Sequence, residues 1–169
     1  MPHPSLAVGR SLGIFLWVTT TWGCQPGGPT GELNTTVQGS EAVALTVSHR
    51  SEWRVLWIEG ATDLPDGAVV SYRVTHSVAT TTPTTDWPSS NLIEVGRATV
   101  EDGQYWARIN TLNWPPGEVR VVAQFPLPPQ PPAVVDQYGE FGEHLRGENV
   151  TDLDGIKAVE VEHVFEHSR

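Results

Sequence analysis

The amino-acid sequence predicts an all-β protein, an antiparallel β-sandwich of about seven strands. Three observations support this prediction. From residue 42 onward the apolar side chains alternate with period two, which is the pattern of half-buried strands. The chain holds 16 Gly and 14 Pro in 169 residues, and this composition is typical of a turn-rich β domain. Turn signals such as Asp102-Gly103 separate the apolar runs.

The apolar runs indicate where the strands lie. They cover residues 42–47, 53–58, 70–76, 92–100, 105–110, 119–125 and 159–165. Because an Asp-Gly pair is a strong hairpin signal, Glu101-Asp102-Gly103 predicts that strands 92–100 and 104–110 form a hairpin. The number of strands and the spacing of the turns favour an immunoglobulin-like or fibronectin-like sandwich over residues 42–166, with a closed barrel as the alternative. Less than about 10% of this range is expected to be helical.

Three of the runs predict which side chains fill the core. Residues 53–58 are apolar on both faces, which indicates a central strand, and Trp53 or Trp57 is expected to be buried. His76 ends another alternating run and is expected to pack on a sheet face. The run with the cleanest alternation predicts four core positions, at Val119, Val121, Ala123 and Phe125.

Two segments interrupt the alternation. Residues 79–90 are rich in Thr and Ser, and they predict a long exposed loop or an irregular crossing at a sheet edge. Residues 126–132 (PLPPQPP) lack most backbone donors, so they are expected in an extended polyproline conformation outside the sheets. We predict that this crossing orients the loop 136–148, in which a helical turn is compatible with the sequence. Tyr138 or Phe141 should then pack onto the end of the sandwich.

The N-terminal segment is typical of a targeting signal. Residues 12–18 form an apolar run that is too short to span a membrane but has the length of a signal-peptide core. Gly23-Cys24 then resembles the lipobox of bacterial lipoproteins, although the two residues before it depart from that motif. Cys24 is the only Cys in the chain. We therefore expect a signal peptide over residues 1–23 and a lipid on Cys24; an ordinary secretory signal and a buried Cys are the alternatives.

A tether and a folded domain are expected after the lipid attachment site. Residues 24–41 begin with a Gly- and Pro-rich stretch and predict a flexible tether, and residues 42–169 predict the β-sandwich domain. The expected location is the cell envelope, either in the periplasm or at the cell surface. The membrane is the expected partner through the lipid on Cys24.

The composition argues against several function classes. The chain has 10 Lys+Arg against 20 Asp+Glu, so a nucleic-acid partner, which requires a basic surface, is not expected. A single Cys excludes an intramolecular disulfide and a thiolate zinc cluster. The acidic residues concentrate in segment 136–166, which is either a solvated face or a docking surface for a basic partner.

The turn and loop motifs carry a family resemblance over roughly residues 55–166. The motifs are Asp63-Leu64-Pro65-Asp66-Gly67, Val100-Glu101-Asp102-Gly103-Gln104-Tyr105, Pro115-Pro116-Gly117, Gln130-Pro131 and Tyr138-Gly139-Glu140-Phe141-Gly142-Glu143. In this order they resemble exported bacterial proteins and lipoproteins of unknown function, in which one immunoglobulin-like β-sandwich follows a signal peptide or lipobox. The resemblance implies a fold and a location, and it implies no catalytic residue.

No catalytic, cofactor or metal motif stands out. The sequence lacks G-x-S-x-G, H-E-x-x-H and phosphate-binding glycine loops, so we predict no enzyme and no cofactor. Asp152 and Asp154, with Glu148, leave a loose calcium site open against a solvated Asp-Gly turn. His163 and His167 lie about 13 Å apart if the segment is a strand, which is too far to bind one metal ion.

Two loop tryptophans are the candidate binding residues. Trp87 and Trp114 each precede a Pro in a loop, where an exposed indole could stack on a sugar ring or on a Pro-rich peptide. The alternative is that each covers a sheet end. The function expected from the sequence is a non-catalytic, envelope-anchored module that binds a partner or acts as a spacer. A carbohydrate- or peptide-binding module and a small hydrolase with an unrecognised site are the alternatives, and the protein or glycan partner stays open.

Overall fold

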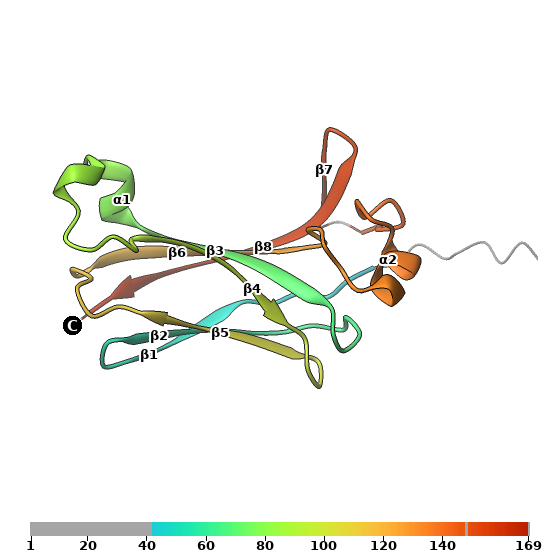
Figure 1. Ribbon diagram of the computed structural model, residues 1–169, viewed down its shortest axis with the longest axis horizontal. Coiled ribbons are helices and arrows are strands. Elements are labelled where there is room, and N and C mark those ends of the chain that lie inside the picture. The colour runs from blue at the N-terminus through green and yellow to red at the C-terminus, as the bar shows by residue number, and fades with distance from the viewer. Residues whose placement is uncertain (1–41, 148, 169) are drawn as a thin grey trace, which may run out of the picture. The chain divides into compact units, whose positions relative to one another are not determined.

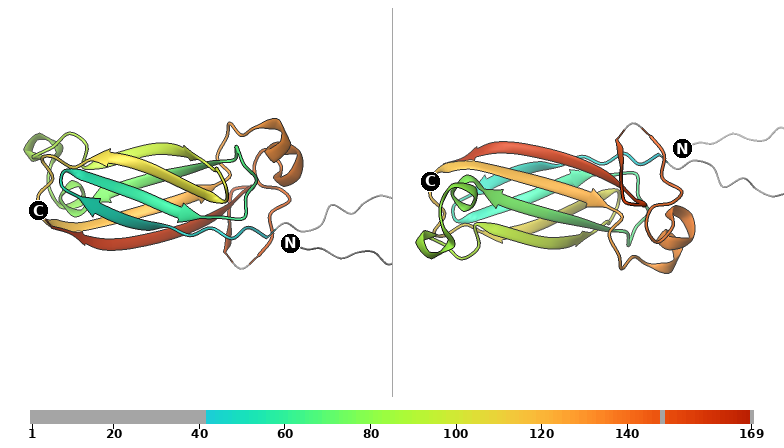
Figure 2. Two further views of the ribbon diagram at one scale, coloured as in Figure 1. Left: turned by 90° about the horizontal axis from the view of Figure 1, so that it is seen from below. Right: turned by 90° about the horizontal axis from the view of Figure 1, so that it is seen from above.

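Two antiparallel sheets pack face to face in the computed structural model of this protein, which describes residues 42–147 and 149–168 (Figure 1). The strands are β1 (Ser48–Glu52), β2 (Val55–Ala61), β3 (Val69–His76), β4 (Ile93–Thr99), β5 (Gln104–Asn110), β6 (Gly117–Phe125), β7 (Val150–Leu153) and β8 (Ile156–His167). One sheet has the order β1-β2-β5, and the other has the order β4-β3-β6-β8-β7. Figure 2 shows the three-stranded sheet from one side and the five-stranded sheet from the other. The predicted all-β sandwich is confirmed.

The core lies between the sheets and follows the period-two pattern. Val119, Val121, Ala123 and Phe125 of β6 are all fully buried, as predicted. Leu56 and Ile58 of β2 face them from the other sheet and are also fully buried. His76 is buried on the inner face as well, where its Nε2 lies 3.0 Å from the carbonyl oxygen of Pro115. Fully burying one such aliphatic or aromatic side chain stabilises the fold by roughly 1.5–3 kcal/mol.

The expectation that Trp53 or Trp57 is buried in the core is wrong for both residues. β2 lies between β1 and β5, so this run does form a central strand. However, Glu52 pairs with Val55, which places Trp53 and Arg54 in a two-residue turn, and Trp53 is 78% exposed. Since successive side chains of a strand point to opposite faces, burial of Leu56 places Trp57 on the outer face.

The predicted hairpin between the fourth and fifth strands is also wrong. Asp102 and Gly103 form the expected tight turn, with φ of +51° and +71°, and Glu101 pairs with Gln104 across it. Beyond the turn, however, β4 pairs with β3 and β5 pairs with β2. The turn therefore carries the chain from one sheet to the other (Figure 1).

The first predicted strand, residues 42–47, is only partly regular. Its one backbone bridge joins Leu45 to Thr62. Side chains provide other contacts, because Ala44 N donates to Asp63 Oδ1 and Thr62 Oγ1 donates to the Ala44 carbonyl. The alternation was nevertheless informative, since Val43 and Leu45 are both buried. β7 was not among the predicted strands, and it forms a hairpin with β8 through a turn at Asp154-Gly155.

Short helices occupy two of the connections. Residues 79–90, predicted as a loop or crossing, overlap α1 (Ser77–Thr81) and include the 3₁₀ turn η1 (Thr84–Asp86), and α2 (Pro132–Tyr138) follows the Pro-rich segment. Helical residues reach 12%, slightly above the expected limit. No helix among the described residues is long and apolar enough to cross a bilayer.

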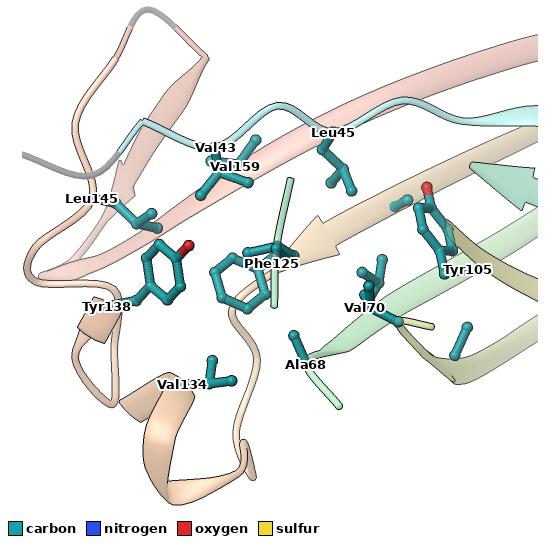
Figure 3. Packing of buried hydrophobic residues seen from close by; sticks show 14 residues of the cluster. Val43, Leu45, Ala68, Val70, Tyr105, Phe125, Val134, Tyr138, Leu145 and Val159 are labelled. Atoms are coloured by element: carbon teal, nitrogen blue, oxygen red, sulfur yellow. The ribbon is translucent and has the colours of Figure 1, made fainter. Parts of the chain in front are cut away.

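Two side chains fasten the Pro-rich crossing to the larger sheet: Arg97 Nη2 of β4 donates to the Pro128 carbonyl at 2.8 Å, and Gln130 bonds Val69 at the start of β3. Gln130 Oε1 accepts from Val69 N at 2.9 Å, and Gln130 Nε2 donates to the Val69 carbonyl at 2.7 Å. The segment then leads into α2, where Tyr138 is buried and meets the Phe125 ring edge-on at 5.2 Å (Figure 3). The prediction that Tyr138 or Phe141 packs onto the sandwich end is therefore confirmed for Tyr138. Phe141 is 40% exposed.

Candidate functional site

The outer face of the three-stranded sheet holds the best candidate binding surface. It forms a shallow cleft of about 640 Å³, lined by Thr46, Ser48, Arg50, Trp57, Glu59, Gly60, Ala61, Gln104, Tyr105 and Trp106. Aromatic rings, charged groups and an amide therefore lie together on one flat strand surface. We call this surface the tryptophan face.

Strand register brings these side chains together. Arg50 of β1 pairs with Trp57 of β2, and Trp57 pairs in turn with Arg108 of β5. The neighbouring outward row joins Glu59 to Trp106 across the same strands. Because paired residues point to the same side of a sheet, both tryptophans project outward between charged neighbours.

The two indoles form an angled aromatic corner. Their ring centres lie 5.5 Å apart, with 57° between the ring planes. Trp106 is 60% exposed, whereas Trp57 is half-buried. The indole nitrogen of Trp57 is covered and makes no hydrogen bond within the described residues. Trp106 is thus the ring that can stack on a ligand, and Trp57 supports it from the side.

A fixed arginine borders the aromatic corner. The Arg50 guanidinium lies 5.0 Å from the centre of the Trp57 ring, in a cation–π contact. It also donates to Glu59 Oε1 from Nε at 3.2 Å and from Nη2 at 3.0 Å, and Nη1 donates to Glu52. These contacts hold the arginine and both carboxylates in place. The face can therefore offer oriented donors and acceptors next to an exposed indole.

The loop tryptophans predicted as binding residues lie elsewhere. Trp114 is only 2% exposed, and its Nε1 donates to Asn91 Oδ1 at 3.0 Å. Trp87 is half-buried, packs on the core, and donates from Nε1 to the Thr82 carbonyl at 3.0 Å. This arrangement matches the alternative in which each ring covers a sheet end. The Trp114 ring is buried and has no surface free for stacking, so the expectation that Trp114 is a binding residue is wrong.

In the part of the chain that the structure describes, the remaining predicted site residues form no metal centre. Cys24 and Glu148 lie outside the described residues. Asp154 belongs to the β7–β8 turn, and Asp152 Oδ1 accepts from Gly155 N within that turn at 3.0 Å. In residues 42–147 and 149–168, no three side chains of His, Cys, Asp or Glu lie so that they could hold a metal ion.

The two histidines of β8 lie in different surroundings: His163 meets His49 across the core, and His167 meets the Trp114 ring. His163 Nε2 lies 2.8 Å from His49 Nδ1 of β1, and the His49 ring stacks on Phe165 with centres 3.5 Å apart. His167 meets the Trp114 ring edge-on, and His76 meets the same ring. The contact between His49 and His163 was not predicted from the sequence, because His49 lies in a short polar strand without clear alternation.

The lowered pKa values of His49 and His167 predict a loss of stability in mild acid. Burial, followed by repulsion from His163, lowers the pKa of His49, and burial, followed by His76, lowers the pKa of His167. Because the unfolded chain keeps the ordinary value of about 6.5, it binds more protons than the folded chain below that pH. This stability is therefore fully present above about pH 6.5 and is lost as the pH falls through the lowered values.

Thermal unfolding at pH 7.5, 6.0 and 5.0 measures this effect. The midpoint should fall with pH, and the fall should be smaller in His49→Gln. Glu143, whose pKa is lowered by backbone hydrogen bonds, loses its contribution only at lower pH and does not interfere. A midpoint that stays constant from pH 7.5 to 5.0 would contradict the prediction.

The alternation shows which side chains share the tryptophan face but leaves open whether that face lies outward. The sequence shows that Trp57 and Leu56 lie on opposite sides of a strand, and that Trp106 and Tyr105 do so as well. Burying Leu56 and Tyr105 places both tryptophans outside.

Comparison of the chain with protein-family models, curated proteins and solved structures finds no match.

Proposed function

We propose that this protein is a non-catalytic, envelope-anchored module that binds a glycan through the tryptophan face. The observation that carries the proposal is the exposed Trp106 ring, supported by Trp57 and bordered by the fixed Arg50–Glu59 pair. A flat indole complements the apolar face of a sugar ring, and neighbouring charged and amide groups can hydrogen-bond its hydroxyls.

The strand arrangement supports an immunoglobulin-like classification within this proposal. β1-β2-β5 packs on β4-β3-β6-β8, and β7 adds one short strand at the edge of the larger sheet. Seven antiparallel strands in two sheets, with connections that cross between them, are typical of this class. Such sandwiches expose broad sheet faces that can carry a binding surface.

The anchoring part of the proposal predicts a lipid on Cys24. The apolar run before the sole Cys supports export and acylation. Mass spectrometry of the mature protein should find acyl groups on an N-terminal Cys24, and Cys24→Ser should move the protein from the membrane fraction to the soluble fraction. Recovery of an unmodified Cys24 within a longer soluble chain would contradict this part of the proposal.

Glycan binding is tested with defined polysaccharides. The full-length protein is mixed with purified peptidoglycan sacculi, chitin and cellulose, and the bound fraction is measured after sedimentation. We expect binding to at least one of them, and Trp106→Ala should weaken that binding by at least about tenfold, because an exposed Trp at the centre of an interface often contributes about 2 kcal/mol or more.

The matched control is Val95→Ala, which alters an exposed apolar residue of β4, in the other sheet. This variant should bind as the unmodified protein does. Equal binding by Trp106→Ala and the unmodified protein would exclude the tryptophan face as the site. Absence of binding to all three polysaccharides would favour the spacer role expected as an alternative from the sequence.

A further inference from the structure

A second and larger cleft lies at the sandwich end where the β1–β2 turn and the β5–β6 loop meet. It has a volume of about 870 Å³ and is lined by Ser51, Glu52, Trp53, Arg54, Pro88, Thr111, Leu112, Asn113, Trp114, His167 and Ser168. We call it the tip cleft. Figure 1 places this end of the sandwich, with the C-terminal end of β8, opposite α2.

Two buried polar groups in the wall of the tip cleft have no partner. Thr111 is 3% exposed and His167 is 7% exposed. Neither Thr111 Oγ1 nor His167 Nδ1 makes a hydrogen bond within the described residues. Native proteins rarely leave such groups unsatisfied, because burying a polar group without a partner destabilises the fold. Both residues line the cleft and both atoms are themselves covered, so a ligand that bonds them must displace the atoms that cover them.

An exposed aromatic ring forms the rim of the tip cleft. Trp53 is 78% exposed, and the Arg54 guanidinium carbon lies 3.7 Å from its ring centre. Arg54 has a φ of +66°, the left-handed conformation at the second position of the two-residue turn between β1 and β2. The hydrogen bond from Thr111 N to the Arg54 carbonyl, at 3.0 Å, ties this rim to the cleft wall.

The charges of the tip cleft favour a neutral ligand. Glu52 and Arg54 balance each other, and the other polar lining groups are hydroxyls, an amide and an imidazole. A hydroxyl can donate to or accept from either unpartnered atom, so a hydroxyl-rich molecule satisfies both without a fixed tautomer of His167. An exposed indole at the rim complements the apolar face of the same kind of molecule.

We propose that the tip cleft is a second binding site, separate from the tryptophan face, that takes one or two sugar rings of a neutral saccharide. Trp53 stacks on the ring, and Thr111 Oγ1 and His167 Nδ1 bond its hydroxyls. This site does not depend on glycan binding by the tryptophan face.

Nuclear magnetic resonance of the isotope-labelled full-length protein tests this site. The probes are glucose, galactose, N-acetylglucosamine, maltose and cellobiose. At least one should shift the indole N–H signal of Trp53 and the ring signals of His167. Thr111→Val should weaken binding by about fivefold, since it removes one hydrogen bond. The same variant should keep or raise the thermal midpoint, because it also removes an unsatisfied hydroxyl.

Two further variants separate this proposal from the preceding one. Trp53→Ala should abolish the saccharide-induced shift of His167, whereas Trp106→Ala should leave the affinity of the tip cleft unchanged. If saccharides shift only Trp57 and Trp106, the tip cleft is not a sugar site, and the tryptophan face is unaffected by that failure. Undiminished affinity in Thr111→Val, or binding of free indole or acetate in place of every saccharide, would also overturn the proposal.

Discussion

Replacing Trp114 with alanine is expected to destabilise the protein by about 3–5 kcal/mol, the range for removing a large buried aromatic side chain. Trp114 is 2% exposed and packs in the cluster that contains Leu56 and Val121. The substitution also leaves Asn91 Oδ1 without the donor that lies 3.0 Å away. The loss therefore combines a cavity with a broken hydrogen bond.

Urea unfolding at pH 7.5 measures the change in free energy. Trp53→Ala is the matched control, because it removes the same side chain from a site that is 78% exposed. The control should change stability by no more than about 0.5 kcal/mol. Similar losses in the two variants would contradict the assignment of Trp114 to the core.

Replacing Tyr138 with alanine should destabilise the protein by about 3–4 kcal/mol. Tyr138 belongs to α2, is 3% exposed, and packs with Val134 and Leu145 around the Phe125 ring (Figure 3). Its ring joins the segment that follows the Pro-rich crossing to the end of the sandwich. Removing the ring opens a cavity at that junction.

Thermal and urea unfolding of Tyr138→Ala are compared with those of Phe141→Ala. Phe141 lies three residues further along the chain and is 40% exposed, so its truncation should cost less than about 1 kcal/mol. Its backbone contacts are unaffected by the change, since its N and O atoms bond Glu143 and Lys157. A larger loss in Phe141→Ala than in Tyr138→Ala would show that the loop is anchored differently.

Period-two alternation predicted the fold because each sheet has one face on a shared core. The inward residues of β6 and the burial of His76 follow directly from that rule. Strand pairing was harder to predict from the sequence than the fold class was. The Asp102-Gly103 turn is as expected locally, but β5 gains its partner β2 from a distant part of the chain. A local turn signal carries no information about such long-range pairing.

The candidate site was harder to predict than the fold. A strand such as residues 55–61 is apolar on both faces, so alternation cannot say which face lies inward, and the core was expected to hold Trp53 or Trp57. Which face of β2 lies inward depends on how β1 and β5 pair with it and on the larger sheet that packs against it. The position of Trp114 also depends on tertiary packing, because its loop folds over the end of the core.

Hydroxyl-radical footprinting of the protein bound to a polysaccharide tests glycan binding by the tryptophan face most directly. Oxidation of each aromatic residue is measured by mass spectrometry with and without the bound polysaccharide identified by sedimentation. Binding should protect Trp106 and Trp57 from oxidation, while Phe141, on the loop after α2, should oxidise at an unchanged rate. Protection of Trp87 without protection of Trp106 would contradict the account and place the ligand on the loops.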